Sequence, residues 1–169
     1  MKKLTLEYIA GFVDGEGCFT ICTRGEDKYS PLFELGNTNL HILQEIQKYF
    51  SFNLKIQTLK RKNPKWKTFY ILRSNTIDAV KSIAHLLEPH LRIKKEQAQI
   101  IMQYPRAQLI NIGGRTQQDF STRAYVLQLR KRIMALNKRG PSTQGADEDL
   151  QPEPDPQLNL LELNQKEVS

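Results

Sequence analysis

Two carboxylates, Asp14 and Glu16, stand where a short helix is predicted to end. The apolar residues that precede them fit one face of such a helix: Tyr8, Ile9, Phe12 and Val13. The C-terminal end of a helix repels negative charge, so acids there are costly unless a cation binds. Glu16, flanked by Gly15 and Gly17, is therefore a candidate metal ligand. The alternative is an ordinary helix end with solvated carboxylates.

Small residues mark one side of the same helix. Gly11 and Gly15 are four positions apart, so they stack on one side and let another backbone approach closely.

The stretch from Ile9 to Gly17 reads IAGFVDGEG and closely resembles the motif of LAGLIDADG homing endonucleases. Weaker likeness rests on LGNTN at 35–39 and LRIKKEQA at 91–98, and the resemblance covers residues 5 to about 105. It implies a saddle-like antiparallel sheet and a site-specific endonuclease that cleaves double-stranded DNA at a long, near-palindromic target.

The resemblance also implies roles for single residues. The Glu16 carboxylate and the Gly15 carbonyl would hold Mg²⁺, or another divalent cation such as Mn²⁺. The catalytic set would be Glu16 with Asn37, which orients water, and Lys94, which lies beside the scissile phosphates. Two simpler interpretations stay open: Asn37 caps the following helix, and Lys94 is a solvated lysine. His41 falls near the same place.

Only one copy of the motif is present in 169 residues, which predicts a homodimer. The motif helices would pack about a two-fold axis through Ala10, Gly11, Asp14 and Gly15. Each chain supplies one Glu16, so the dimer would bring two carboxylates together at the scissile phosphates.

The formal charge of +7 is unevenly spread. Residues 141–169 hold seven acids and one lysine, and residues 1–140 hold 24 basic and 11 acidic residues. The strongly basic charge of residues 1–140 favours a nucleic-acid partner. We expect one domain over 1–140 and an acidic, proline-containing tail over 141–169, in which leucines near 160 are able to dock on the body.

Some classes are excluded by what the sequence lacks. There is no Cys/His spacing typical of zinc, no apolar run of membrane-spanning length and no N-terminal export signal. Cys18 and Cys22 are too far apart along a strand for a disulfide. We expect an intracellular protein, cytoplasmic or organellar, with no membrane partner.

Caps and periodicity predict an α+β (mixed α/β) fold in the order α-β-β-α-β-β-α, with two antiparallel hairpins, helices on one face of the sheet and more helices toward the C-terminus. Residues 107–115 are predicted to form a loop. The expected elements are a helix from Thr5 to Asp14, strands 18–24 and 28–36, a helix 40–50, strands 54–61 and 66–73, a helix capped by Asn75 or Thr76, and a helix 119–136 with Leu129, Ile133 and Leu136 among its apolar positions.

Alternation assigns one face of the sheet to DNA. If Phe19, Ile21, Phe33, Leu35, Leu54 and Ile56 face the core, the polar neighbours face a major groove. An eight-residue strand spans about 26 Å, or about 8 bp, so two chains would cover at least about 16 bp. The predicted DNA-binding residues are Thr20, Cys22, Arg24, Lys28, Ser30, Glu34, Lys55, Gln57, Arg61, Lys67, Phe69 and Arg73.

Two other functions use the same fold and charge. One is an RNA-binding intron maturase, which would make RNA a partner, and the other is a DNA-binding regulator that does not cut. An intact set of Glu16, Asn37 and Lys94 favours cleavage.

Overall fold

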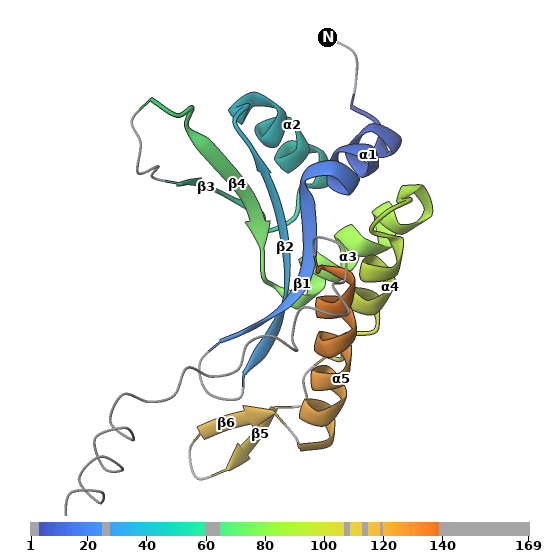
Figure 1. Ribbon diagram of the computed structural model, residues 1–169. Helices are drawn as coiled ribbons and strands as arrows, with labels where there is room; N and C mark the ends of the chain where they lie inside the picture. The colour runs from blue at the N-terminus through green and yellow to red at the C-terminus, as the bar shows by residue number, and fades with distance from the viewer. Residues whose placement is uncertain are drawn as a thin grey trace, which may run out of the picture. The chain divides into compact units, whose positions relative to one another are not determined.

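Four antiparallel strands form an open sheet, and helices cover one of its faces (Figure 1). The structure, a computed structural model, describes residues 4–24, 28–59, 65–106, 109–112, 115–118 and 120–138. Its elements are α1 (Leu6–Glu16), β1 (Gly17–Thr23), β2 (Tyr29–Asn37), α2 (Leu40–Phe50), β3 (Lys55–Leu59), β4 (Phe69–Ser74), α3 (Ile77–Leu87), a 3₁₀ turn (Glu88–His90), α4 (Lys95–Met102), β5 (Leu109–Ile112), β6 (Arg115–Gln118) and α5 (Phe120–Leu136). The predicted α+β class and element order are confirmed.

Helix α1 begins at the predicted cap. The Thr5 hydroxyl accepts from the Tyr8 N–H at 3.3 Å. The backbone N–H of Glu7 and the Thr5 side chain hold the pKa of the Glu7 carboxyl below its usual value. The helix ends at Glu16, two residues beyond the predicted end, because the Gly17 N–H bonds the Val13 carbonyl and closes one more turn.

The strand order is β1-β2-β4-β3, so β1 and β3 are the edges. One row of paired residues crosses the whole sheet, with Cys18 opposite Glu34, Glu34 opposite Arg73, and Arg73 opposite Lys55. Strand β2 pairs with β4 only over Phe33–Asn37, whereas it pairs with β1 over Tyr29–Leu35. Beyond the end of β4, therefore, β1 and β2 continue as a two-stranded ribbon (Figure 1).

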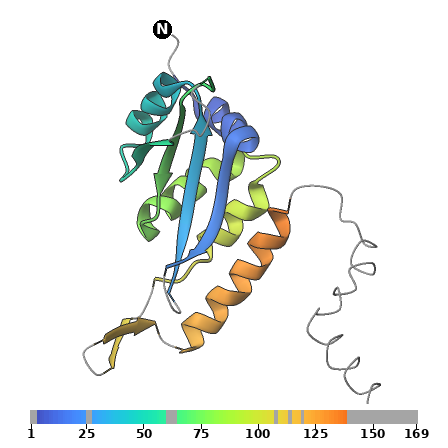
Figure 2. The same ribbon diagram turned by 60° about the vertical axis from the view of Figure 1, so that its left-hand side comes forward.

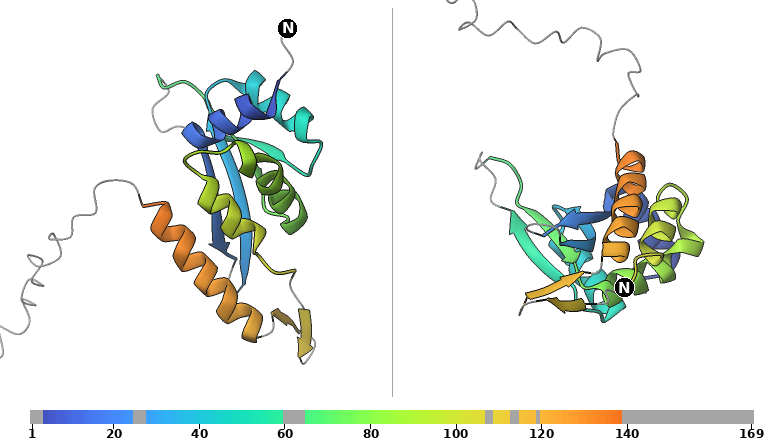
Figure 3. Two further views of the ribbon diagram at one scale, coloured as in Figure 1. Left: turned by 90° about the vertical axis from the view of Figure 1, so that its right-hand side faces the viewer. Right: turned by 90° about the horizontal axis from the view of Figure 1, so that it is seen from below.

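The core lies between the sheet and the helices. Phe19 and Phe33 are fully buried and their rings lie 5.1 Å apart. The predicted inward face is confirmed, with Ile21, Leu35 and Leu54 buried and Ile56 half-buried. Figure 3 shows α1, α3, α4 and α5 in front of β1 and β2 when viewed from the helical side.

Helix α5 runs alongside the edge strand β1 (Figure 2). It buries Val126, Leu129 and Ile133. Leu136, the last apolar position named from the sequence, is 37% exposed. The apolar stripe has the period of a helix, and Leu136 lies after its last buried turn, so Val126 and not Leu136 completes the stripe.

Two predicted segments need correction. Strands β5 (Leu109–Ile112) and β6 (Arg115–Gln118) pair antiparallel, although a loop was predicted over 107–115. Gly113-Gly114 between two short runs is typical of a two-residue hairpin turn, and this signal went unused. Strand β4 begins at Phe69 and not at Trp66, because its pairing with β3 stops at Leu59 opposite Phe69. Arg61, the end of the predicted third strand and the tail 141–169 lie outside the described residues.

Candidate functional site

The loop after the 3₁₀ turn is fastened to the last turns of α1 by Asp14. The two Asp14 carboxylate oxygens accept backbone N–H groups from Arg92 at 2.8 Å, Ile93 at 3.2 Å and Lys94 at 2.9 Å. A carboxylate that accepts hydrogen bonds from three backbone N–H groups has most of its acceptor capacity occupied within its own chain. Asp14 was predicted at the dimer interface, but the structure gives its carboxylate a role inside the protomer.

Lys94 is brought to the same end of α1 from 80 residues away in the sequence. Its ammonium donates to the Asp14 backbone carbonyl, one of the groups that helix geometry leaves without a helical partner. A cation is favourable at this negative end of the helix. Lys94 is half-buried, so it is not the solvated lysine that the sequence left as an alternative.

Glu16 is the last residue of α1 and is exposed, as is Gly15 beside it. A Cβ built at Gly15 meets nothing within 4 Å. The helix end therefore offers an accessible carboxylate and a backbone carbonyl, both hard oxygen donors. In the described part of the chain, no group of three or more His, Cys, Asp or Glu could hold a metal ion, so one chain does not complete a carboxylate-rich site.

Asn37, the last residue of β2, is engaged locally. Its Oδ1 accepts the Asn39 N–H at 2.8 Å. Asn39, not Asn37, caps α2, since its side chain accepts from the N–H groups of His41 at 3.1 Å and Ile42 at 3.4 Å. The His41 ring lies 3.6 Å from the Glu45 carboxylate, one turn along the helix.

The predicted DNA face is one continuous side of the sheet. The strand register places Cys18, Thr20, Cys22, Ser30, Leu32, Glu34, Lys55, Gln57, Leu59, Phe69, Ile71 and Arg73 on it. Among these strand residues Glu34 is the only carboxylate. Arg24 and Lys28 are exposed just beyond the strand ends, but Lys67 precedes β4, so alternation does not place it.

Phe69 is less available on this face than its position suggests. A Cβ at Gly36 would come within 2.6 Å of the Phe69 ring. The far end of the ring therefore lies close against Gly36, and Phe69 is half-buried.

Two arginines on the face are held by neighbours from other elements. The Nε of Arg24 donates to Ser30 Oγ at 3.1 Å, and Asn75, with its amide oxygen turned toward Arg24, accepts from Nη1 at 3.0 Å. Arg73 donates from Nη1 to Gln57 Oε1 at 3.2 Å, and its Nη2 lies 3.3 Å from Glu34 Oε1. The sequence had assigned Asn75 only to a helix cap; Thr76 occupies that cap position instead, without a side-chain hydrogen bond.

These residues border a cavity of about 430 Å³ at the end of β4. Arg24, Lys55 and Arg73 contribute three cations to its lining, together with polar side chains such as Gln57 and Asn75. Its composition suits a polar ligand that presents hydrogen-bond acceptors.

The residues predicted at the dimer surface differ in how exposed they are in the protomer. Gly11 and Gly15 are exposed and a Cβ at either position meets open space. Ala10 is fully buried within its own chain, so it does not lie on that surface. Two large apolar side chains that were not predicted at the interface are also exposed. Tyr8 is 53% exposed and Ile93 is 72% exposed.

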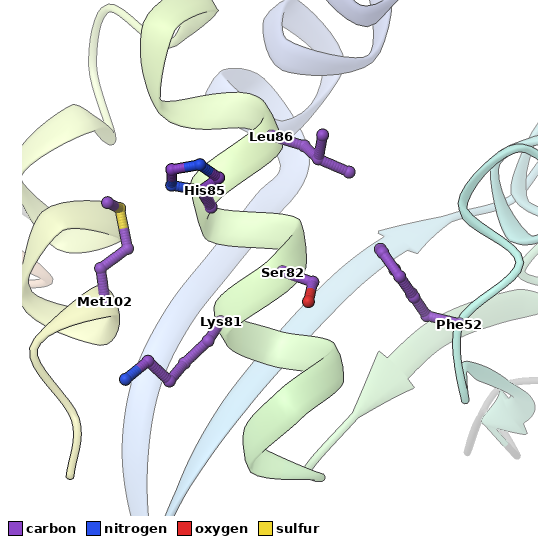
Figure 4. A pocket seen from close by; sticks show the side chains of 6 residues that line it. All are labelled: Phe52, Lys81, Ser82, His85, Leu86 and Met102. Carbon is purple, nitrogen blue, oxygen red and sulfur yellow. The ribbon is translucent and has the colours of Figure 1, made fainter. Parts of the chain in front are cut away.

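A second cavity, of about 500 Å³, lies among the helices. Figure 4 shows Lys81 and His85 on the side of α3 that faces Met102, and Leu86 on the side of Phe52. The Lys81 ammonium is already bonded to the Tyr104 carbonyl at 2.8 Å. None of the six residues that line this cavity is a carboxylate, so it lacks the ligand that the proposed Mg²⁺ site would need.

Comparison with known families identifies this arrangement. A family model described as LAGLIDADG endonuclease matches residues 9–104, more than half of the chain. The chain belongs to the LAGLIDADG endonuclease family. The matched residues include the C-terminal part of α1, the four-stranded sheet and Lys94, so the helix end and the sheet face described above both lie within the match. No curated protein matches the chain.

Solved structures share the fold at low sequence identity. The homing endonuclease I-CvuI in complex with the I-CreI target in the presence of Mg, with its DNA not cleaved, is 21% identical over 82% of this chain and 85% of that chain, with a TM-score of 0.54. I-CvuI with its own target and Ca is 19% identical over 80% and 83%, with a TM-score of 0.57. The archaeal intron-encoded homing endonuclease I-Vdi141I with DNA is 14% identical over 80% and 85%, with a TM-score of 0.60.

None of the helices in the described residues has the length and apolarity needed to cross a membrane.

Proposed function

We propose that this member of the LAGLIDADG endonuclease family is a homodimeric, site-specific endonuclease that hydrolyses phosphodiester bonds in double-stranded DNA with a divalent cation. The observation that carries the proposal is the exposed Glu16 at the end of α1, with the Lys94 ammonium on the backbone carbonyl of Asp14. A carboxylate and a lysine at one helix end are the groups that phosphodiester hydrolysis requires near the reacting phosphate.

Glu16 and the Gly15 carbonyl fit a divalent cation. Both are hard oxygen donors, and both are accessible at the helix end. Mg²⁺ suits this sparse donor set because it retains several waters. When bound, the cation lowers the pKa of a coordinated water and stabilises charge on the phosphate oxygens. Since each chain supplies one carboxylate, two chains together would complete the metal site.

A second copy of the chain would supply the other carboxylate. The open Gly11 and Gly15 side of α1 allows close approach of another helix, and the exposed Tyr8, three and seven positions before them, lies on the same side of α1. A two-fold axis there would place both Glu16 residues near one another. Symmetry of the dimer in turn requires a near-palindromic target.

Lys94 and Asn37 have supporting roles in this proposal. An ammonium has three donors, and one of them is used on the Asp14 carbonyl. The others would face phosphate oxygens and stabilise developing charge. The Asn37 oxygen is occupied by the Asn39 N–H, so its amide NH₂ is the group that would orient a water.

The polar sheet face would lie against the major groove. Cations on this face, including Arg24, Lys55 and Arg73, favour a polyanion, and the ribbon formed by β1 and β2 has a shape that the major groove admits. The solved structures with this fold hold DNA.

The test is cleavage of a randomised duplex library, read by sequencing the cut ends. Wild-type protein is expected to cut one family of near-palindromic sequences with Mg²⁺ and none with EDTA. Glu16→Gln removes the ligand charge at almost the same volume, so cleavage should fall at least about 100-fold while DNA binding remains. Glu7→Gln, the same change at the other end of α1, is the matched control and should cut normally.

Two results would overturn the proposal. One is normal cleavage by Glu16→Gln, which would remove the catalytic assignment. The other is a wild-type protein that binds no duplex DNA above background at low salt, which would remove the substrate class.

A further inference from the structure

Arg73 is fixed on both sides before any ligand arrives. Strand β4 lies between β2 and β3, and the two Nη atoms contact Glu34 on β2 and Gln57 on β3. The Arg73 and Glu34 side chains are each about one-third exposed, at 33% and 32%. An arginine already held in one rotamer loses less conformational freedom on binding.

The space beside Arg73 is polar and partly open to solvent. The cavity of about 430 Å³ is bordered by Arg73 and Gln57, by Lys55 opposite Arg73, and by Arg24, which Asn75 holds in place. A ligand group that enters this space meets the guanidinium of Arg73 in a set orientation. The fork of an arginine matches two adjacent acceptors.

Glu34 makes a base edge a better partner for Arg73 than a backbone phosphate. Its carboxylate is 3.3 Å from the Arg73 guanidinium and would repel a phosphate at that point. The guanine edge in the major groove presents N7 and O6, which are uncharged acceptors. Its cytosine partner presents an N4 donor, which a carboxylate accepts. A neighbouring Arg and Glu therefore complement a G·C pair.

We propose that Arg73 is a specificity-determining residue that reads a guanine, and that Glu34 and Gln57 are positioning residues that hold its guanidinium toward the base edge. Each half of the target then contains one G·C pair that Arg73 contacts. This inference rests on the proposed function, because it assumes that the sheet face lies in the major groove of DNA.

The experiment measures binding and cleavage on duplexes in which every base pair of one half-site is changed singly. Wild-type protein is expected to prefer guanine at one position by roughly 10- to 100-fold. Arg73→Ala and Arg73→Lys should both lose that preference and keep the preferences at other positions, since lysine keeps the charge but not the fork. Arg73→Lys also serves if the alanine variant folds poorly.

Glu34→Gln tests the positioning role and keeps the shape of the side chain. We expect the guanine preference to fall at least about threefold, while the dependence of affinity on salt stays that of wild type. Lys55→Ala, directly opposite Arg73 on β3, is the matched contrast for a phosphate contact. It should weaken binding to all sequences equally and lower the salt slope of the dimer by about 1.8, which is about 0.9 for each chain.

Two outcomes overturn the inference. One is an Arg73→Ala protein that keeps every base preference, and the other is a uniform loss of affinity with a reduced salt slope. With either outcome, cleavage by the wild-type protein still supports the proposed function. Failure of the Arg73 inference can therefore be distinguished from failure of the proposed function. A wild-type protein without any DNA binding overturns the proposed function first.

Discussion

At the scale of single residues, two acids that look equivalent in the sequence have opposite surroundings. Asp14 accepts three backbone N–H groups from the loop at 92–94, whereas Glu16 is exposed at the end of the helix. Spacing explains the difference: on a helix, residues two apart point about 200° apart. Asp14 therefore faces its own chain when Glu16 faces away.

We expect Asp14→Asn to lower the free energy of unfolding by about 1–3 kcal/mol, because an amide replaces one acceptor oxygen with a donor beside N–H groups. Urea denaturation measures this. Asp78→Asn is the matched control, since Asp78 makes only an exposed ion pair with Arg106 at 3.4 Å. That pair contributes about 0–1 kcal/mol. Equal effects of the two substitutions would contradict the role assigned to Asp14.

At the scale of elements, α1 passes into β1 with no loop between them. Glu16 ends the helix and Gly17 begins the strand. The φ of Gly17 is −87°, a conformation open to any residue. The requirement for glycine at this position is therefore one of space and not of backbone conformation. A Cβ there would lie 2.8 Å from both Val13 Cγ1 and the Val13 carbonyl oxygen.

We expect Gly17→Ala to destabilise the fold by about 1–3 kcal/mol, because the new methyl group overpacks a helix carbonyl that cannot move freely. Thermal and urea unfolding followed by circular dichroism measure the change. Gly15→Ala, two residues earlier, has open space within the protomer and should leave the stability of the protomer itself unchanged or raise it. If both substitutions are neutral, the junction at Gly17 is looser than the structure shows.

Caps and periodicity predicted most elements because these signals are local. Asn39, the apolar stripe of α2 and the alternation of β1 are all set within a few residues. The hairpin of β5 and β6 and the start of β4 were mispredicted. A strand exists only where its partner does, so its limits depend on residues distant in the sequence.

At the scale of the whole molecule, α1 has a side that the protomer leaves open. Gly11 and Gly15 lie on it, and Tyr8 lies near them, with its ring stacked on Phe12 at 6.3 Å between ring centroids. A second α1 packed there would account for both the small residues and the exposed aromatic ring.

We expect Gly11→Leu to convert the dimer into a monomer of intact fold, because leucine has space in the protomer but not against a second helix. Replacing glycine by leucine in a helix adds about 0.5–1 kcal/mol of propensity, so the helical circular dichroism should remain. Light scattering measures the mass. Ala135→Leu, an enlargement at an exposed position of α5, is the control and should stay dimeric. A wild-type protein that is monomeric at working concentration would remove the prediction.

The sequence by itself determined the family resemblance, the order of the first seven elements and the inward face of the sheet. These depend on short-range patterns of size, polarity and capping. Tertiary structure alone decided that Asp14 turns inward, that Lys94 reaches the end of α1 from 80 residues away, and that Glu34 and Gln57 brace Arg73. Those contacts join residues far apart in the chain, and only packing of the helices and strands fixes which side chains meet.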